Sequence, residues 1–260
     1  MTAVEIRDME KVDEYFIGTC THEDESDEMD ACGWRRTAWL RVMFEEGVRV
    51  KVAHTNGERV GFLYAMPIEI APWGPIGSDL LVVPCLYVKK EAEGEGVGEA
   101  LMKEAEEEAR RQGKKGVATI GYHGDFWFMP AGFFEKCGYT VAAREEDTAI
   151  MWKTFDQSAK PPRFLTPAYV YKPVPGKVVV DLFWHPFCAT VDIEAQRVRE
   201  VAEEFGDQVI LNDYCTEDRE TLLECQTARA IFVNGKEIGW GHEAPRDGIR
   251  EAIDKALREL

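Results

Sequence analysis

The chain has 260 residues, with 31 lysines and arginines against 48 aspartates and glutamates, which gives a formal net charge of −17. This excess of acid argues against a nucleic-acid-binding protein, which needs a basic surface, and against docking on an anionic membrane. A cationic partner is compatible with the charge, although a self-repelling soluble surface is the simpler explanation. Hydrophobic residues make up 45% of the sequence, so one large or two modest globular domains are expected.

The sequence carries no sign of export or of membrane insertion. No apolar stretch approaches the ~20 residues that span a bilayer, and Met1–Glu10 lacks the basic start and apolar run of a secretory signal. The seven cysteines are odd in number and scattered, unlike those of a disulfide scaffold. We therefore predict a cytoplasmic protein with reduced thiols. No metal is predicted, because Cys20, His22 and Cys32 lack the paired spacing of zinc sites.

The first part of the chain is expected to mix strands and helices. A strand at Val4–Ile6 and a helical stretch through Tyr15 and Phe16 come first, followed by an acidic run at His22–Asp30, which we interpret as a solvated loop or as an attractor for a cationic amine. The next helix is predicted over Cys32–Glu46, with an apolar side formed by Trp34, Trp39, Leu40 and Met43. An Asn-Gly pair at Asn56–Gly57 predicts a hairpin between strands Val48–Ala53 and Arg59–Ala65.

A buried strand, two helices and three further strands are predicted next. They are Asp79–Val88 (strand), Glu99–Gln112 (helix), Gly116–Tyr122 (strand), Ala131–Lys136 (helix), Gly138–Ala143 and Thr148–Thr154 (a strand pair). Five prolines in residues 156–176 then predict a semi-extended linker whose aromatic side chains pack along a surface. We expect a domain at 1–155 before this linker and another at 177–260 after it.

The second domain is expected to be a compact βαβαββα unit. Its elements are predicted at Val178–Phe183 (strand), Val191–Phe205 (helix), Gln208–Asn212 (strand), Thr216–Cys225 (helix), Ala230–Val233 and Lys236–Gly239 (a hairpin), and a last helix with Ile249, Ala252, Ile253 and Leu257 on one face.

A glycine-rich turn is the most informative segment. A buried strand ends at Val88, Gly94, Gly96 and Gly98 follow, and a helix begins at once. Glycine lets the backbone approach a ligand closely, and the amides at a helix start are free donors for an anion. Glycine-rich turns are common, so the spacing alone is a weak signal for a pyrophosphate site.

The context of this turn resembles motif A of the GNAT acyl-CoA N-acyltransferases, in which Arg/Gln-x-x-Gly-x-Gly/Ala connects strand four to helix three. The matching run here is Glu93–Gly98, and Ala131–Tyr139 is similar to a second segment of that family. The resemblance spans about Val4–Phe155. It implies an α/β fold with a mixed sheet and transfer of an acetyl group from acetyl-CoA to an amine. The amine cannot be identified from the sequence.

By position, the resemblance implies a set of residues that bind acetyl-CoA. The pantetheine arm would pair with the backbone of Leu86, Tyr87 and Val88, and the pyrophosphate would lie on the turn formed by Gly94, Glu95, Gly96, Val97, Gly98 and Glu99. A strand-four amide would stabilise the oxyanion.

Two residues depart from the family pattern. Glu93 replaces the usual Arg or Gln, which weakens the expected affinity for CoA unless Lys89 or Lys90 offsets the charge. Phe134 occupies the position of a tyrosine often used as general acid. The catalytic candidates by location are therefore Cys85, Tyr87 and His123. The alternatives are that Cys85 is a small thiol packed in the core and that His123 is a hydrogen-bonding residue on the surface.

The second domain resembles thioredoxin and glutaredoxin folds, and the whole chain resembles GNAT proteins with a YoaP-like C-terminal domain. His185 stands where a redox motif would have its nucleophilic cysteine, and Cys188 follows at a helix start. Cys215 or Cys225 could serve as its partner only if folding brings one close. Two alternatives to the transferase stay open: a thiol-dependent redox or sensor protein using Cys188, and a degenerate GNAT scaffold that binds ligand without catalysis. Whether the chain forms a homodimer also stays open.

Overall fold

The computed structural model describes residues 4–126, 128–239 and 242–260. Contacts divide the chain into two compact units, one formed by residues up to Ile17 together with Leu40–Leu165, the other by Gly18–Trp39 together with Thr166–Leu260. The segment Gly18–Trp39 thus groups with the C-terminal part of the chain, whereas the division into 1–155, 156–176 and 177–260 stays a prediction. None of the helices in the described ranges combines the length and apolar character that crossing a bilayer requires.

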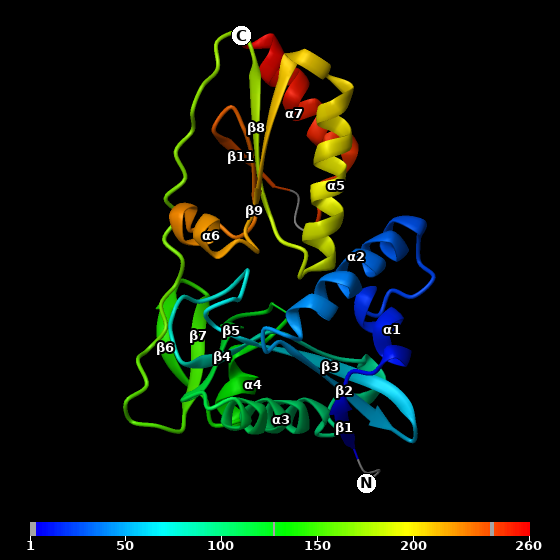
Figure 1. The fold of residues 1–260 in the computed structure, drawn as a ribbon, viewed down its shortest axis with the longest axis vertical. Coiled ribbons are helices and arrows are strands. Elements are labelled where there is room, and N and C mark those ends of the chain that lie inside the picture. Colours follow the sequence, from blue (N-terminus) through cyan, green and yellow to red (C-terminus); the bar gives the residue numbers. More distant parts are fainter. Residues whose placement is uncertain (1–3, 127, 240–241) are drawn as a thin grey trace. The chain divides into compact units, whose positions relative to one another are not determined.

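The first unit is built on one mixed sheet, drawn in blue to green in Figure 1. Its strands are β1 (Glu5–Asp8), β2 (Arg49–Thr55), β3 (Glu58–Pro67), β4 (Leu80–Val88), β5 (Gly116–Tyr122), β6 (Thr140–Glu145) and β7 (Thr148–Thr154). They lie in the order β1-β2-β3-β4-β5-β7-β6, and the pair β4–β5 is parallel while the other neighbours are antiparallel. The predicted α/β class with a mixed sheet is confirmed for this unit.

Helix α3 (Val97–Arg111) covers one face of this sheet, and α4 (Ala131–Lys136) packs beside β5 and β7 (Figure 1). The apolar positions of α3 recur at helical spacing, so one side of it is buried against the sheet. That side consists of Val97, Leu101, Met102, Ala105 and Ala109. Compared with the predicted Glu99–Gln112, the helix begins two residues earlier, which brings its first turn directly after Gly96.

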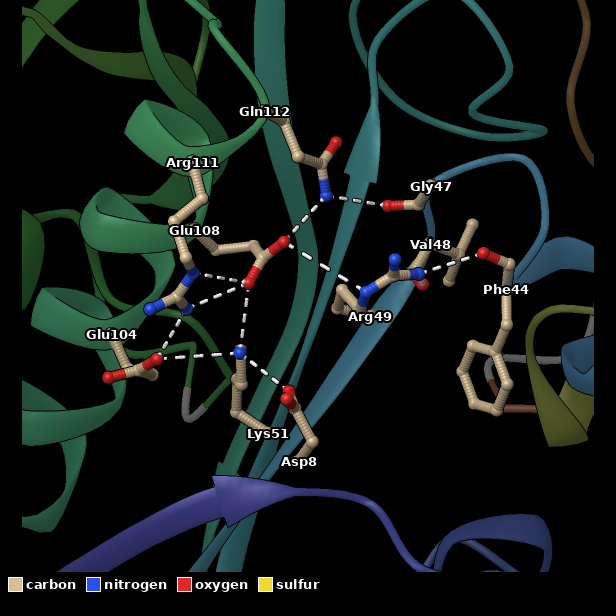
Figure 2. A network of polar contacts seen from close by, with 10 residues as sticks. All are labelled: Asp8, Phe44, Gly47, Val48, Arg49, Lys51, Glu104, Glu108, Arg111 and Gln112. Atoms are coloured by element: carbon tan, nitrogen blue, oxygen red, sulfur yellow. Dashed lines mark hydrogen bonds and ion pairs between the residues drawn. The ribbon is translucent and has the colours of Figure 1, made fainter.

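A buried polar network ties α3 to β1 and β2 (Figure 2). Lys51 is 1% exposed, and its Nζ lies 2.6 Å from Asp8 Oδ1 and 3.0 Å from Glu108 Oε2. Arg111 also donates to Glu108, at 2.8 Å, and Gln112 joins Glu108 to the Gly47 carbonyl, at 2.9 and 2.8 Å. Each oxygen of the Glu108 carboxylate is therefore paired, as a buried charge requires.

The hairpin between β2 and β3 is confirmed at the predicted turn. Asn56 and Gly57 have φ of 55° and 82°, the two positive values that a two-residue type I′ turn needs. An added Cβ at Gly57 would meet nothing within 4 Å, so this glycine is required by its backbone conformation and not by crowding.

Helix α1 (Glu14–Gly18) precedes α2, which spans Asp27–Met43 and thus begins five residues before the predicted Cys32. The end of the acidic run forms the first turn, where carboxylates complement the positive end of the helix dipole, and the Ser26 hydroxyl accepts from the Met29 amide at 3.1 Å. The interpretation of this part of the run as a loop was wrong. Trp34 is 64% exposed, so its assignment to the apolar side was also wrong: the buried side instead contains Gly33, against which Gly18 packs closely.

The second unit contains a smaller mixed sheet with the strand order β11-β10-β8-β9. Its elements are β8 (Val178–Trp184), α5 (Ala189–Glu204), β9 (Val209–Cys215), α6 (Arg219–Cys225), β10 (Ala230–Val233), β11 (Lys236–Ile238) and α7 (Arg246–Arg258). A short 3₁₀ turn occurs in this unit at Gly206–Gln208, and two occur in the first unit, at Lys11–Asp13 and Lys90–Ala92. Strands β8 and β9 are parallel, and α5 and α7 pack on one face of the sheet (Figure 1).

Aromatic side chains of the Pro-rich segment cover the opposite face of the second sheet. Tyr169 stacks on Phe232 with 4.1 Å between ring centroids, and its hydroxyl donates to the buried Asp181 at 2.6 Å. Tyr171 lies against Gly235, where a Cβ would come within 2.7 Å of its side chain. These contacts confirm the expectation that the aromatic residues after Thr166 pack along a surface.

Candidate functional site

Strands β4 and β5 separate midway along the first sheet. They pair only from Leu80 with Gly116 to Val83 with Thr119. Beyond that point Cys85–Val88 continue to pair with β3, and β5 continues to pair with β7 up to Tyr122. The edge of β4 that faces β5 is therefore free of strand partners from Pro84 onward in the described sheet. Such an edge offers amides and carbonyls to an extended ligand.

Local sequence explains why the strands separate there. Pro84 has no amide hydrogen to donate to a neighbour. The pairing with β3 shifts by one residue between Tyr64 and Met66, so β4 has an extra residue at Val83–Pro84 that bends it. The Thr119 hydroxyl donates to the Val83 carbonyl at 2.7 Å. That side-chain contact occupies the carbonyl at the point of separation.

A cavity of about 1120 Å³ lies in the first unit beside the free part of β4. All nine residues predicted to bind acetyl-CoA line it. They are Leu86, Tyr87, Val88, Gly94, Glu95, Gly96, Val97, Gly98 and Glu99. The sequence pattern thus located the lining of one cavity, and the binding role of these residues stays a prediction.

The glycines of the turn have distinct structural reasons. Gly94 and Gly96 have φ of 78° and 83°, and an added Cβ would meet nothing within 4 Å at either position, so the space in front of the turn is open. Gly98 instead allows close packing, because a Cβ there would come within 3.0 Å of the Phe133 ring. Gly96 is the N-cap of the 15-residue α3 and leaves the first-turn amides without a side-chain cap. These amides are suited to an anion.

The side chains around the cavity carry both signs of charge. Glu93, Glu95 and Glu99 contribute three carboxylates, and Lys90 and Lys136 contribute two ammonium groups. Lys89, named from the sequence as a possible compensating charge, lies over the Phe16 ring at 5.2 Å and is not among the lining residues. Lys136 was not predicted from the sequence. Its spacing of three from Phe133 on α4, which places both on one helix face, was the available signal.

The three predicted catalytic residues lie in different surroundings. Tyr87 lines the cavity, and its ring stacks on Phe62 with 5.7 Å between centroids. Cys85 is half-buried on the same strand and is not a lining residue. The amide of His123, just past β5, donates to the Asp147 carbonyl at 2.7 Å. The buried Nε2 of His123 has no hydrogen-bond partner among the described residues. A catalytic role stays a prediction for each of them.

Phe134 has no polar atom to offer a substrate. It is fully buried and makes edge contacts with Phe133 and Tyr139 at 5.1 and 6.1 Å. Burial raises the pKa of the Tyr139 phenol, and Tyr139 does not line the cavity. A proton donor at this cavity must therefore come from another position. Tyr87 carries the one hydroxyl among the lining residues of the described chain.

Comparison with known proteins identifies the domain that contains this cavity. Residues 46–141 match the family model described as "Acetyltransferase (GNAT) domain". Among curated proteins, none matches the chain.

Several solved structures match part of the chain. For yncA of Salmonella typhimurium, solved with its cofactor acetyl-CoA, the identity is 22%, the match covers 61% of this chain and 98% of that chain, and the TM-score is 0.45. For the PaiA N-acetyltransferase of Thermoplasma acidophilum, in complex with coenzyme A, the identity is 18%, the coverage 59% and 99%, and the TM-score 0.43. For the YhbS GNAT N-acetyltransferase of Escherichia coli, in complex with CoA, the values are 17%, 61%, 87% and 0.43.

The domain match covers β2–β5, the glycine turn, α3 and α4, which together include every residue that lines the cavity. Residues 46–141, which contain the whole lining of the cavity, therefore match a GNAT acetyltransferase domain.

Proposed function

We propose that the protein transfers the acetyl group of acetyl-CoA to an amine, with the cosubstrate bound in the cavity between the free edge of β4 and the start of α3. The observation that carries this proposal is the separation of β4 from β5 directly before a glycine turn with open space in front of it. An extended thioester arm needs the strand edge, and a diphosphate needs the helix amides, so both requirements of the cosubstrate are met by adjacent segments.

In this reaction the neutral amine nitrogen attacks the thioester carbonyl carbon and loses a proton to a base or to a chain of waters. The carbon–sulfur bond breaks, and CoA leaves as a thiolate that takes up a proton. An amide on the free edge of β4 would hold the carbonyl oxygen as negative charge develops on it. Tyr87 is our proposed proton donor, because it brings a hydroxyl to the cavity wall. Cys85 and His123 remain proposed catalytic residues, His123 because its buried Nε2 is unpartnered among the described residues.

The proposal is tested by ligand-induced thermal stabilisation. Acetyl-CoA should raise the melting temperature of the wild-type protein, and Gly96→Glu should abolish this shift because a carboxylate would occupy the open space before α3. Gly57→Glu is a matched control: its φ of 82° nearly equals the 83° of Gly96, and its Cβ also meets nothing within 4 Å. Both variants should lose about 1–2 kcal/mol through the left-handed backbone, but Gly57→Glu should keep the full ligand shift.

Failure of acetyl-CoA and of other acyl-CoA thioesters to stabilise the wild-type protein would end this proposal. Equal loss of the ligand shift in Gly57→Glu would mean that general destabilisation, and not the cavity, explains the effect of Gly96→Glu.

The charge of the cavity makes a second test possible. Glu93→Arg reverses the charge at the position where the family usually has Arg or Gln, so we expect CoA to bind about ten times more tightly at low salt, with a smaller gain at high salt. Glu91→Arg makes the same charge change at an exposed residue that does not line the cavity, and its effect should be much smaller. Isothermal titration with CoA at two ionic strengths measures both. Equal gains in the two variants would contradict a phosphate site beside Glu93.

A binding scaffold without catalysis is the second candidate function. The three carboxylates at the cavity and the apolar Phe134 favour it, because the carboxylates repel the proposed diphosphate and Phe134 cannot donate a proton. Acetylation of any amine by the purified protein would rule it out.

We propose further that the second unit is thioredoxin-like and of the YoaP type. The order β8-α5-β9-α6-β10-β11-α7, with β8 and β9 parallel, supports this proposal. We also propose that the acceptor is a small-molecule amine and that the protein is cytoplasmic. The choice between a monomer and a homodimer stays open. The acidic run is a weaker argument for a cationic acceptor than it was in the sequence, since Glu28 is paired with Arg197 and Arg246.

A further inference from the structure

Two cysteines from distant parts of the sequence come together at the start of α5 in the second unit. Cys188 is the N-cap of α5, with its Sγ 3.2 Å from the Thr190 hydroxyl. Cys20 packs against the small cluster formed by Cys32, Ala189 and Ile193. Burial raises the pKa of the Cys20 thiol, Arg36 opposes the rise, and the Cys188 thiol adds to it, which is an effect of a neighbouring group. Cys20, which packs against the cluster that contains the residue after Cys188, is therefore the thiol that we consider as its partner.

A buried arginine joins the two backbone segments that carry these thiols. Arg36 is 2% exposed, and its Nε donates to the Phe187 carbonyl, one residue before Cys188, at 2.9 Å. Its NH1 donates to the Gly18 carbonyl, two residues before Cys20. One rigid guanidinium thus fixes the spacing of both segments.

Further contacts hold α2 against α5 in the same unit. The Cys32 thiol donates to the Ala189 carbonyl at 3.6 Å, and Arg35 binds the buried Asp192 with Nε–Oδ2 at 2.9 Å. Arg197 pairs with Glu28, with Nε 3.0 Å from Oε1. The helix that follows the Cys20 turn is therefore firmly connected to the helix that Cys188 caps.

The surroundings of the thiols decide which pair can react. Cys20 and Cys188 are both partly exposed, whereas Cys32 is completely buried. Burial raises the pKa of the Cys20 thiol as well as that of Cys32, so exposure and not pKa distinguishes the two. Burial raises the pKa of the Cys215 and Cys225 thiols, and the charged groups that act on them are carboxylates, Arg199 and Lys172. Burial, with Arg229 and Arg36 nearby, lowers the pKa of His185 to about 3, so this imidazole is neutral and Arg36 is the positive charge beside the pair.

We propose that Cys20 and Cys188 are a redox-active dithiol that a low-molecular-weight disulfide converts to an intramolecular disulfide. The Cys188 thiolate attacks one sulfur of the oxidant, the oxidant's sulfur–sulfur bond breaks, and its first thiol leaves with a proton. The deprotonated Cys20 then attacks Cys188 Sγ in the mixed disulfide and releases the second thiol, which takes up a proton. Two protein thiols are oxidised, and one external disulfide is reduced to two thiols. This site is independent of the acetyltransferase cavity.

The test uses the full-length protein and oxidised glutathione. The reduced protein is freed of reductant, treated with oxidised glutathione, alkylated and analysed by mass spectrometry. We expect the wild-type protein to lose two alkylatable thiols without retaining glutathione, to yield a peptide that links Cys20 to Cys188, and to recover both thiols with dithiothreitol. Cys20→Ser should retain one glutathione on Cys188, because the second step is blocked. Cys225→Ser, a partly exposed thiol outside the pair, should form the disulfide as the wild type does.

A wild-type protein that keeps glutathione on Cys188 while Cys20 remains free would overturn the proposal. A link from Cys188 to Cys32, Cys215 or Cys225 would do the same. Because the linked peptide is sought in the wild-type protein, the decision does not depend on whether a variant folds.

Discussion

Replacing Lys51 by methionine is expected to lower the free energy of unfolding of the first unit by about 1.5–3 kcal/mol, the usual contribution of a hydrogen bond to a charged group, because Glu108 loses one donor while Arg111 and Gln112 still donate to it. The side chain of Lys51 is 2% exposed and that of Glu108 is 7% exposed, so water cannot replace the lost ammonium group (Figure 2). Asp8 is different, because its carboxylate is 66% exposed and remains solvated in the variant. The penalty therefore comes mainly from Glu108.

A matched control and a double variant make this prediction specific. Lys115→Met removes an ion pair of similar length, 3.0 Å to Asp79, whose side chains are 33% and 56% exposed, and should cost less than about 1 kcal/mol. Adding Glu108→Gln to Lys51→Met removes the buried carboxylate that has lost one of its donors and should restore part of the stability. Denaturant-dependent hydrogen exchange in a peptide covering α3 would report on the first unit alone. A Lys51→Met variant as stable as Lys115→Met would show that the network does not hold α3.

The sequence located the cavity because its determinants are local. The strand end at Val88, the three glycines and the following helix lie within one short stretch, and each has a direct physical consequence for the backbone. Even the two-residue shift in the start of α3 left the predicted lining residues unchanged. The separation of β4 from β5 follows from Pro84, which was present in the sequence but was interpreted only as part of a buried strand.

The features that the sequence did not reveal depend on distant partners. Lys51 alternates with apolar residues along its strand, a pattern that by itself indicates a solvated side chain. It is buried because it pairs with Asp8 and Glu108, which lie 43 and 57 residues away in the chain. Cys20 and Cys188 are likewise brought near each other only after α2 and α5 pack together. The burial of Gly33 and the exposure of Trp34 reverse the expectation from hydrophobicity, since close helix packing needs a small residue whatever the apolar character of its neighbour.

The same network gives the first unit a defined acid sensitivity. Burial alone would raise the pKa of Glu108, but hydrogen bonds from Gln112, Arg111 and Lys51 outweigh it and lower the pKa from 4.5 to about 2. A carboxyl whose pKa is depressed by folding stabilises the protein above its unfolded pKa and loses that contribution as the pH falls toward the folded value. We therefore expect on the order of 3 kcal/mol of stability to disappear between about pH 5 and pH 2.

Glu108→Gln should flatten this part of the stability profile, because an amide does not titrate. Glu107→Gln, the neighbouring exposed residue on α3, removes one carboxylate from the same helix and should leave the slope unchanged. Unfolding of the α3 peptide by hydrogen exchange at several acidic pH values measures the slopes. Equal slopes in the wild-type and Glu108→Gln proteins would assign the acid sensitivity to other groups. Since the first turn of α3 forms one wall of the cavity, loss of this anchor at low pH should also release the segment proposed to hold the diphosphate of acetyl-CoA.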